Sequence, residues 1–139
     1  MYDIAIIGAG PAGAILAREL GLRRKVLLAD ARPLHDPVRK FGYKGKQAVF
    51  EDKCCGGLLA PDAKEWLARN KFALPASALD EVQPGRLRGL DLSTSIERVY
   101  PTTYINLSRA VFEQWLLSLV PKDVDTLYGY RAAEISREK

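Results

Sequence analysis

The feature that most constrains the fold is a glycine-rich turn, Gly8-Ala9-Gly10-Pro11-Ala12-Gly13, which fits the pattern G-x-G-x-x-G. Residues 2–7 before it form a short apolar run, as expected of a strand buried on both faces. Residues 11–22 after it carry apolar side chains at helical spacing, and residues 25–29 form a second apolar run. The sequence therefore predicts two parallel strands joined by a crossover helix, with the turn at the helix N-terminus.

The three glycines of this unit, which spans residues 2–30, have separate roles in a dinucleotide site. We expect Gly8 to permit the tight turn, Gly10 to let a diphosphate approach the backbone, and Gly13 to let helix and strand pack closely. The pattern alone is weak, but here it follows a predicted strand and opens a predicted helix. The alternative is a glycine-rich strand–helix turn that binds no ligand.

The remaining residues of the candidate site lie at the start of the helix and at the end of the second strand. Pro11 and Ala12 open a helix whose N-terminus offers N–H groups and a partial positive charge to a diphosphate. Asp30 stands 20 residues after Gly10, where an acid accepts hydrogen bonds from ribose hydroxyls, and Ala31 follows it. An acid at this place disfavours a 2′-phosphate, so NADP is disfavoured here.

Beyond Asp30 the sequence predicts an irregular stretch followed by alternating helices and strands. The expected elements are an irregular segment with at most one short helix (32–60), a helix (61–71), an antiparallel pair (86–93 with 96–107), a helix (108–120) and a last strand (125–135). The fold class predicted is α/β, with a Rossmann-like parallel sheet, helices and a small antiparallel pair. All 139 residues are expected to form a single domain.

Composition and charge exclude several classes of function. Apolar residues make up 47% and charged residues 27%, which is typical of a globular protein. The net charge of +4 is scattered rather than gathered into a basic stripe, so we expect no nucleic-acid partner. The single histidine, His35, and the adjacent Cys54 and Cys55 match no metal-site spacing. The apolar run at 4–17 is too short to span a bilayer and follows an acid, so we expect a cytoplasmic protein.

Three stretches resemble a known family. The opening Tyr-Asp-Ile-Ala-Ile-Ile-Gly-Ala-Gly-Pro-Ala-Gly looks like the start of FAD-dependent oxidoreductases of the two-dinucleotide type. Residues 53–62, Lys-Cys-Cys-Gly-Gly-Leu-Leu-Ala-Pro-Asp, resemble the Cys-Gly-Gly segment of the geranylgeranyl reductase family, a branch of the flavin monooxygenase-like superfamily. Residues 105–109, Ile-Asn-Leu-Ser-Arg, with Phe112 and then Trp115-Leu116, resemble that family's Arg-x-x-Phe-x-x-x-Leu helix.

The resemblance implies FAD as the cofactor and assigns residues to it. Gly8, Gly10, Gly13 and Asp30 would hold the ADP half. The rest of the FAD would be contacted by Cys55 and Gly56 in the loop at 53–60, beside the flavin, by Arg109 at the diphosphate or ribityl chain, and by Ala132 at the adenine. No residue is indicated as a catalytic acid or base.

The resemblance further implies a flavin-dependent oxidoreductase in which NAD(P)H reduces the flavin, which then reduces a C=C bond of a small, isoprenoid-like substrate. Members of the family are much longer than this chain and carry a second, Gly-Asp fingerprint and a substrate-binding sheet. We therefore expect the N-terminal part of such an enzyme, with weak FAD binding and no turnover by itself. Peripheral membrane contact of the whole enzyme stays open. The alternatives are an FAD-dependent monooxygenase, a plain NAD-binding domain and a non-catalytic nucleotide-binding module.

Overall fold

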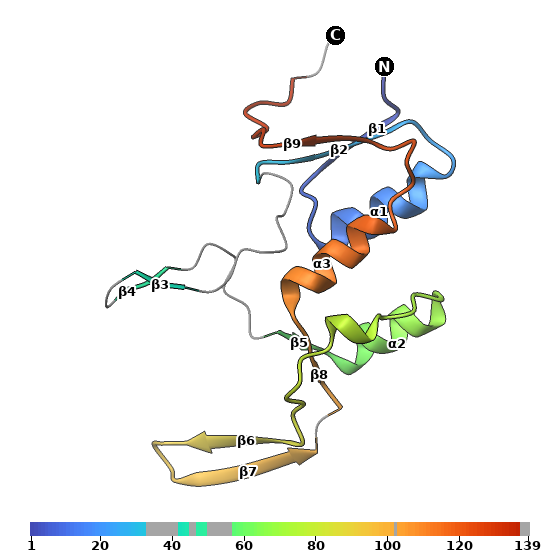
Figure 1. The fold of residues 1–139 in the computed structure, drawn as a ribbon. Helices are drawn as coiled ribbons and strands as arrows, with labels where there is room; N and C mark the ends of the chain where they lie inside the picture. The colour runs from blue at the N-terminus through green and yellow to red at the C-terminus, as the bar shows by residue number, and fades with distance from the viewer. Residues whose placement is uncertain (33–41, 45–46, 50–56, 102, 137–139) are drawn as a thin grey trace. The chain divides into compact units, whose positions relative to one another are not determined.

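The computed structural model describes residues 1–32, 42–44, 47–49, 57–101 and 103–136. The chain divides into two compact units: Met1–Lys40 together with Ala110–Lys139, and Phe41–Arg109. The elements in chain order are β1 (Ile4–Ile7), α1 (Pro11–Gly21), β2 (Val26–Asp30), β3 (Gly42–Lys44), β4 (Gln47–Val49), β5 (Leu58–Leu59), α2 (Pro61–Arg69), a 3-10 turn (Ala76–Ala78), β6 (Arg86–Asp91), β7 (Ile96–Pro101), β8 (Ile105–Asn106), α3 (Arg109–Ser118) and β9 (Asp125–Tyr128) (Figure 1).

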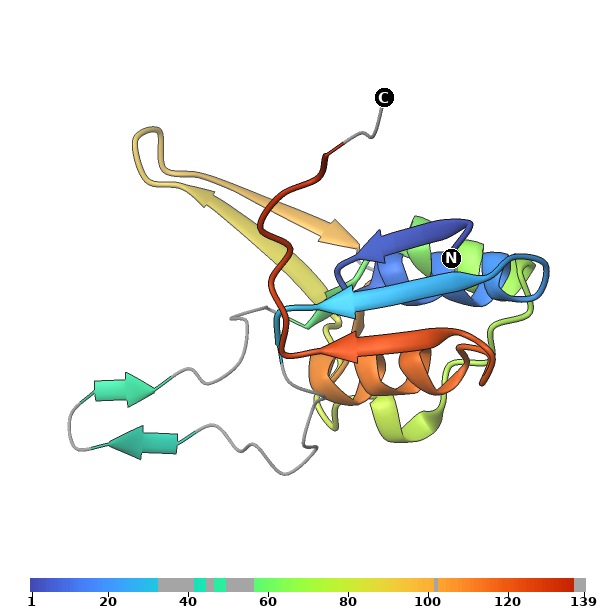
Figure 2. The ribbon, with the colours of Figure 1, turned by 90° about the horizontal axis from the view of Figure 1, so that it is seen from above.

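The first unit is built on a parallel three-stranded sheet in the order β1-β2-β9. Ile4 pairs with Val26 at one end of the β1–β2 ladder, and Asp30 pairs with Tyr128 at the end of the β2–β9 ladder. Helices α1 and α3 lie on the same face of this sheet, as Figures 1 and 2 show. The predicted α/β class, with a parallel sheet, helices and a small antiparallel pair, is confirmed.

The core of this unit lies between the sheet and the two helices. Its buried members are apolar side chains of the strands, the glycine turn, α1 and the residue before β9: Ile6, Ala9, Ala17, Val26, Leu28 and Val124. Leu20 of α1 and Leu117 of α3 pack against them. On the opposite face of the sheet, Ile7 is 57% exposed and Leu127 is 39% exposed. The expectation that the first strand is buried on both faces is therefore wrong, because no described helix covers the second face.

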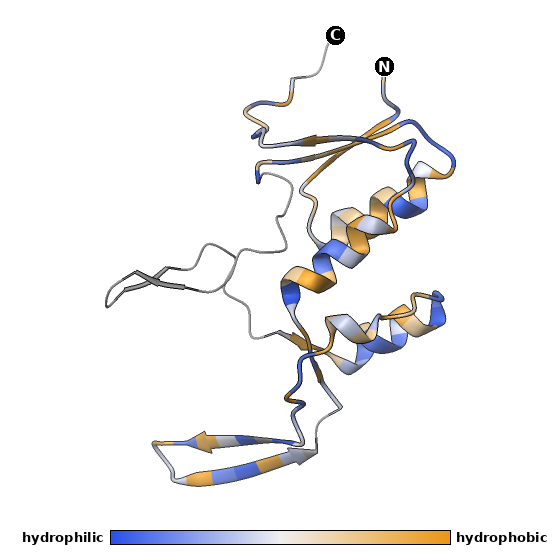
Figure 3. Cartoon of the chain, in the orientation of Figure 1, coloured by the Kyte–Doolittle hydropathy of each residue, from blue (hydrophilic) through white to orange (hydrophobic). Residues whose placement is uncertain are grey.

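The second unit holds short antiparallel pairs and helix α2. Strands β6 and β7 form a hairpin in which Asp91 pairs with Ile96, and hydrophilic and hydrophobic residues are mixed along both strands (Figure 3). Strand β8 does not extend this hairpin, as the expected strand at 96–107 would; it pairs instead with β5. In the stretch at 32–60, the described parts are Arg32, the short strands β3 and β4, Gly57, β5 and Ala60.

Two predicted elements are shorter in the structure. The last strand ends at Tyr128 rather than at residue 135, because Gly129 takes a left-handed conformation with φ of +82° and its N–H turns back to the carbonyls of Asp30 and Arg32. Helix α2 ends at Arg69 and is capped by Asn70.

In the part of the chain that the structure describes, no helix is long and apolar enough to cross a membrane. The single domain expected over all 139 residues stays a prediction.

Candidate functional site

The glycine turn joins β1 to α1, and two of its glycines are required by the fold itself. Gly8 has φ of +108°, a conformation that side chains disfavour, and its N–H donates to the carbonyl of Ala29 at 2.7 Å. A Cβ on Gly13 would lie 1.8 Å from the carbonyl oxygen of Gly8 and 3.5 Å from Cγ2 of Ile6. Gly13 therefore lets α1 approach β1 closely, as the sequence predicts.

Gly10 is different, because nothing in the described structure requires a glycine there. It is the N-cap of α1, its φ is −74°, and a Cβ on it would meet no atom within 4 Å. No side chain caps the N-terminus of α1, where Pro11 occupies the first turn. Among the described residues nothing fills the space beside Gly10, so the backbone N–H groups and the positive dipole end of α1 are open to a ligand there. This geometry fits an anion such as a diphosphate.

Asp30 ends β2 beside the glycine turn, and its carboxylate is buried and fully hydrogen-bonded. Oδ2 accepts the N–H of Ala9 at 2.6 Å and Nη2 of Arg32 at 3.1 Å. Oδ1 accepts the backbone N–H of Arg32 at 2.8 Å and its Nε at 3.0 Å. These bonds, those of the Arg32 side chain above all, outweigh the effect of burial and hold the pKa of Asp30 well below its usual range. Asp30 is therefore charged at neutral pH.

Sequence reasoning missed Arg32 and Glu113, which complete a charged cluster around Asp30. Nη1 of Arg32 contacts Oε2 of Glu113 at 3.3 Å, and Glu113 is only 3% exposed although its side chain is an acid. The hydrogen bonds of Arg32 to Asp30 have the largest effect and raise the pKa of its guanidinium, and the contact with Glu113 raises it further. Burial has the opposite, smaller effect. In the structure Glu113 is buried on α3 together with Phe112 and Leu116. The apolar stripe that the sequence predicts for this helix does not include Glu113, so no clear signal marked it. A buried acid requires a partner, which here is Arg32.

The loop after β9 binds the backbone of Asp30 as well. The N–H groups of Gly129 and Tyr130 donate to the carbonyl of Asp30, at 2.9 Å and 3.3 Å. Burial and then the charge of Asp30 raise the pKa of Tyr128, the residue that pairs with Asp30 in the sheet. The acid is thus fixed from both of its neighbouring strands.

The structure gives no contact to the Asp30 cluster for the other predicted site residues. Cys55 and Gly56 lie outside the described residues. Ala31 and Ala132 are exposed and lie in no strand, and Arg109 begins α3 but belongs to the second unit. Their roles stay predictions.

Gly57, the last residue of the predicted Cys-Gly-Gly segment, has a structural role of its own. Its φ is +69°, and a Cβ there would lie 2.6 Å from the carbonyl oxygen of Leu107 and 2.8 Å from Oδ1 of Asn106. The carbonyl of Gly57 also accepts the N–H of Leu107 at 2.9 Å. Gly57 therefore allows β5 and β8 to lie side by side.

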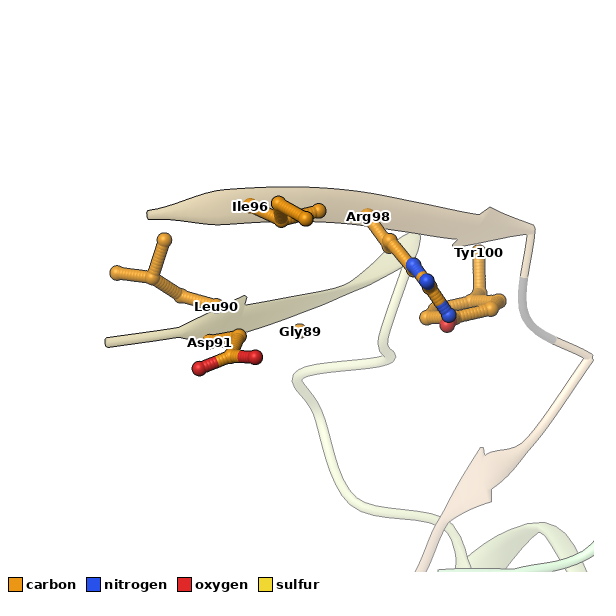
Figure 4. Close-up of a pocket in the computed structure, with 6 residues that line it drawn as sticks. All are labelled: Gly89, Leu90, Asp91, Ile96, Arg98 and Tyr100. Carbon is orange, nitrogen blue, oxygen red and sulfur yellow. The ribbon is translucent and has the colours of Figure 1, made fainter. Parts of the chain in front are cut away.

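The second unit has a hollow of its own. A hollow of about 340 Å³ lies along one face of the β6–β7 hairpin, lined by Gly89, Leu90, Asp91, Ile96, Arg98 and Tyr100 (Figure 4). It is formed by one hairpin alone and holds none of the residues predicted for the nucleotide. Among the described residues, no group of three or more His, Cys, Asp or Glu side chains could hold a metal ion.

Comparison with known proteins gives long but partial matches. No family model matches the chain. Protein CbrA of Escherichia coli O157:H7 and that of Shigella sonnei are each 36% identical to it over 137 residues, and the protein of that name in Escherichia coli K12 is 35% identical. Each alignment covers 99% of this chain but 36% of the relative. The chain thus spans about a third of the length of these curated relatives.

Solved structures with a similar fold are flavin-dependent enzymes and a reductase-like protein. A geranylgeranyl bacteriochlorophyll reductase-like protein from Thermoplasma acidophilum superposes with a TM-score of 0.68 at 20% identity, over 99% of this chain and 32% of its own. The halogenase PltM in complex with phloroglucinol and FAD gives 0.57 at 17% identity, over 99% and 29%. A triple mutant of the flavin-dependent brominase Bmp2 gives 0.60 at 18%, over 92% and 30%. These likenesses show the fold.

Proposed function

We propose that this chain is the N-terminal FAD-binding part of a flavin-dependent oxidoreductase. The observation that carries the proposal is the open N-terminus of α1 at Gly10, next to an ionised acid, Asp30, that is tied to the glycine turn through the N–H of Ala9. An anion-binding helix end and a ribose-binding acid at neighbouring strand ends are the two halves of an ADP site.

The residues present fit the ADP half of FAD. The N–H groups at the start of α1 would bind the diphosphate, with Gly10 leaving room for its oxygens, and Asp30 would accept the ribose hydroxyls. The proposal assigns the isoalloxazine to the loop that holds Cys55 and Gly56, and the ribityl or diphosphate region to Arg109. FAD in PltM, a halogenase of similar fold, supports the choice of FAD over NAD.

The finer proposal is that the complete enzyme reduces a C=C bond of an isoprenoid-like small molecule. It rests on the resemblance of residues 53–62 to the Cys-Gly-Gly segment and is supported by the reductase-like protein of Thermoplasma acidophilum among the similar folds. When bound, FAD would supply hydride-transfer chemistry there, with NAD(P)H as the hydride source and a proton completing the reduction of that bond. The residues of this chain would bind and orient the cofactor.

A flavin-dependent monooxygenase is the second candidate, because halogenases and a brominase described as flavin-dependent share the fold. Mass analysis of the product separates the two for the complete enzyme. A reductase adds two hydrogens to the substrate, whereas a monooxygenase adds one oxygen.

The FAD assignment is tested by titrating the purified protein with FAD and recording the visible difference spectrum of the flavin. We expect a saturable spectral change that Gly10→Val abolishes, because the new side chain fills the space at the helix N-terminus. Gly85→Val is the matched control, since a Cβ on Gly85 also meets no atom within 4 Å but lies in the second unit. Equal FAD affinity in Gly10→Val and the wild type, or no spectral change at all, would contradict the proposal.

A further inference from the structure

The acid that the proposed function assigns to ribose has every acceptor position already filled. A carboxylate offers about four lone-pair positions. Asp30 receives four donors: two backbone N–H groups, from Ala9 and Arg32, and two side-chain groups of Arg32, Nε and Nη2. A ribose hydroxyl can therefore bind Asp30 only where one of these donors leaves.

Only the side-chain donors are free to leave without disturbing the fold. The N–H of Ala9 belongs to the glycine turn, and the N–H of Arg32 directly follows β2. The guanidinium, by contrast, holds Oδ1 through Nε and Oδ2 through Nη2, one bond to each oxygen. This two-pronged contact is also the one that the vicinal 2′- and 3′-hydroxyls of a ribose make with a carboxylate.

Glu113 provides a second acceptor for the guanidinium. Its Oε2 already contacts Nη1 of Arg32 at 3.3 Å, so the arginine can release Asp30 and keep one acid partner. The side chain of Arg32 is 30% exposed, whereas those of Asp30 and Glu113 are 9% and 4% exposed. Arg32 is thus the outermost member of the cluster, and its movement opens Asp30 to a ligand from solvent.

We propose that Arg32 acts as an internal substitute for ribose, and that a nucleotide with free 2′- and 3′-hydroxyls binds by displacing it from Asp30 while Glu113 retains it. This inference rests on the proposed function. In the exchange each buried carboxylate keeps a donor: the diol bonds to Asp30, and the guanidinium bonds to Glu113. Arg32 thereby sets both the affinity for the adenosine ribose and the selectivity for a complete diol.

The test measures binding of ADP and of 2′-deoxy-ADP by isothermal titration calorimetry, in the wild type and in Arg32→Met. The variant keeps an unbranched side chain but has no donors for Asp30. We expect ADP to bind about tenfold more tightly to the variant. In the wild type the ribose must first break the hydrogen bonds between Arg32 and Asp30, whereas in the variant these bonds do not exist. Loss of a cation by itself weakens binding of an anionic ligand, so a tighter complex has the opposite sign from a simple charge effect.

The selectivity for the diol gives a readout that a merely structural role of Arg32 does not change. In the wild type, 2′-deoxy-ADP displaces one arm of the guanidinium and leaves the other in place, so the missing hydroxyl costs little. In Arg32→Met the same ligand leaves one oxygen of Asp30 without its hydroxyl donor. The preference for ADP over 2′-deoxy-ADP is therefore expected to increase in the variant.

Two further variants guard against a misfolded protein and against general charge effects. Arg32→Lys keeps the charge for Glu113 but cannot form the two-pronged contact, so we expect intermediate tightening. Arg23→Met, at an exposed base between α1 and β2, is the control and is expected to leave the preference between the two ligands unchanged.

The outcomes separate this inference from the function on which it rests. Tighter ADP binding and a larger diol preference in both Arg32 variants support it. Unchanged or weaker ADP binding in both, with wild-type binding that Gly10→Val abolishes, overturns the inference and leaves the FAD proposal standing. No binding of ADP by the wild type or by either Arg32 variant overturns both.

Discussion

Replacing Gly13 and Gly10 separately by alanine is expected to divide the glycine turn into a folding part and a binding part. The Cβ of Gly13→Ala would lie 1.8 Å from the carbonyl oxygen of Gly8 and 3.0 Å from its carbonyl carbon. Both neighbours are backbone atoms, so α1 and β1 must move apart. Overpacking of this kind costs roughly 1–3 kcal/mol, and a clash with backbone lies at the upper end. The better helix propensity of alanine returns about 1 kcal/mol. We expect a net loss of about 2 kcal/mol.

Gly10→Ala is expected to leave stability almost unchanged and to weaken binding instead. Its Cβ meets no atom within 4 Å and its backbone is in an ordinary region. Alanine is a poorer N-cap than glycine by roughly 0.5–1 kcal/mol, while the lower entropy of the unfolded chain offsets about 0.4–1 kcal/mol. The free energy of unfolding should therefore change by less than about 0.5 kcal/mol. Binding of FAD, in contrast, should weaken.

The assay is urea denaturation followed by tryptophan fluorescence. Trp115 lies in α3 and Trp66 in α2, which belong to the first and the second unit. In a Trp66→Phe background the signal reports only the unit that contains the glycine turn. Equal losses of stability in the two alanine variants, or an unchanged Gly13→Ala, would refute the reasoning. The packing in the structure would then not be what requires Gly13.

Three further results are expected. Gly57→Ala should destabilise the second unit by about 2 kcal/mol, measured through Trp66 fluorescence, because a Cβ there lies 2.6 Å from the carbonyl oxygen of Leu107 and the φ of +69° disfavours a side chain. Leu116→Ala should cost about 2–5 kcal/mol in urea denaturation, since Leu116 is 1% exposed, whereas Leu92→Ala at an 84% exposed position should change little. Asp30 has a lowered pKa in the folded state, so its contribution to stability is present above the unfolded-state value of 3.8 and is lost as pH falls below it. The stability difference between wild type and Asp30→Asn should shrink as pH is lowered below about 4, and a difference independent of pH would contradict this.

Local sequence patterns predicted the strand–turn–helix–strand unit because its signals are short-range. Gly8, Gly13 and the apolar spacing of α1 act within a few residues of one another. The predicted last strand was too long because the hydrogen bonds of Gly129 to the carbonyls of Asp30 and Arg32 come from a distant part of the chain. The run of β-forming residues in 96–107 likewise could not show that β8 would leave the hairpin to pair with β5.

The candidate site was predicted only in part for a similar reason. Asp30 was found because the dinucleotide pattern fixes its distance from the glycines. The contact between Arg32 and Glu113 joins residues 81 positions apart, and no local pattern encodes such a pair. The burial of Glu113 depends on how α3 packs, which the spacing of apolar residues along the helix did not define.

The pairing of β2 with β9 also bears on how the protein is made. Leu27 pairs with Asp125, so the first unit is assembled from two segments that flank the whole second unit. During synthesis β1, α1 and β2 leave the ribosome early, and they lack β9 until roughly a hundred more residues have been added, which at typical rates takes several seconds. Throughout this interval the apolar side chains that α3 later covers are accessible to chaperones and proteases. The yield of folded protein should therefore depend on the rate of translation across residues 41–109.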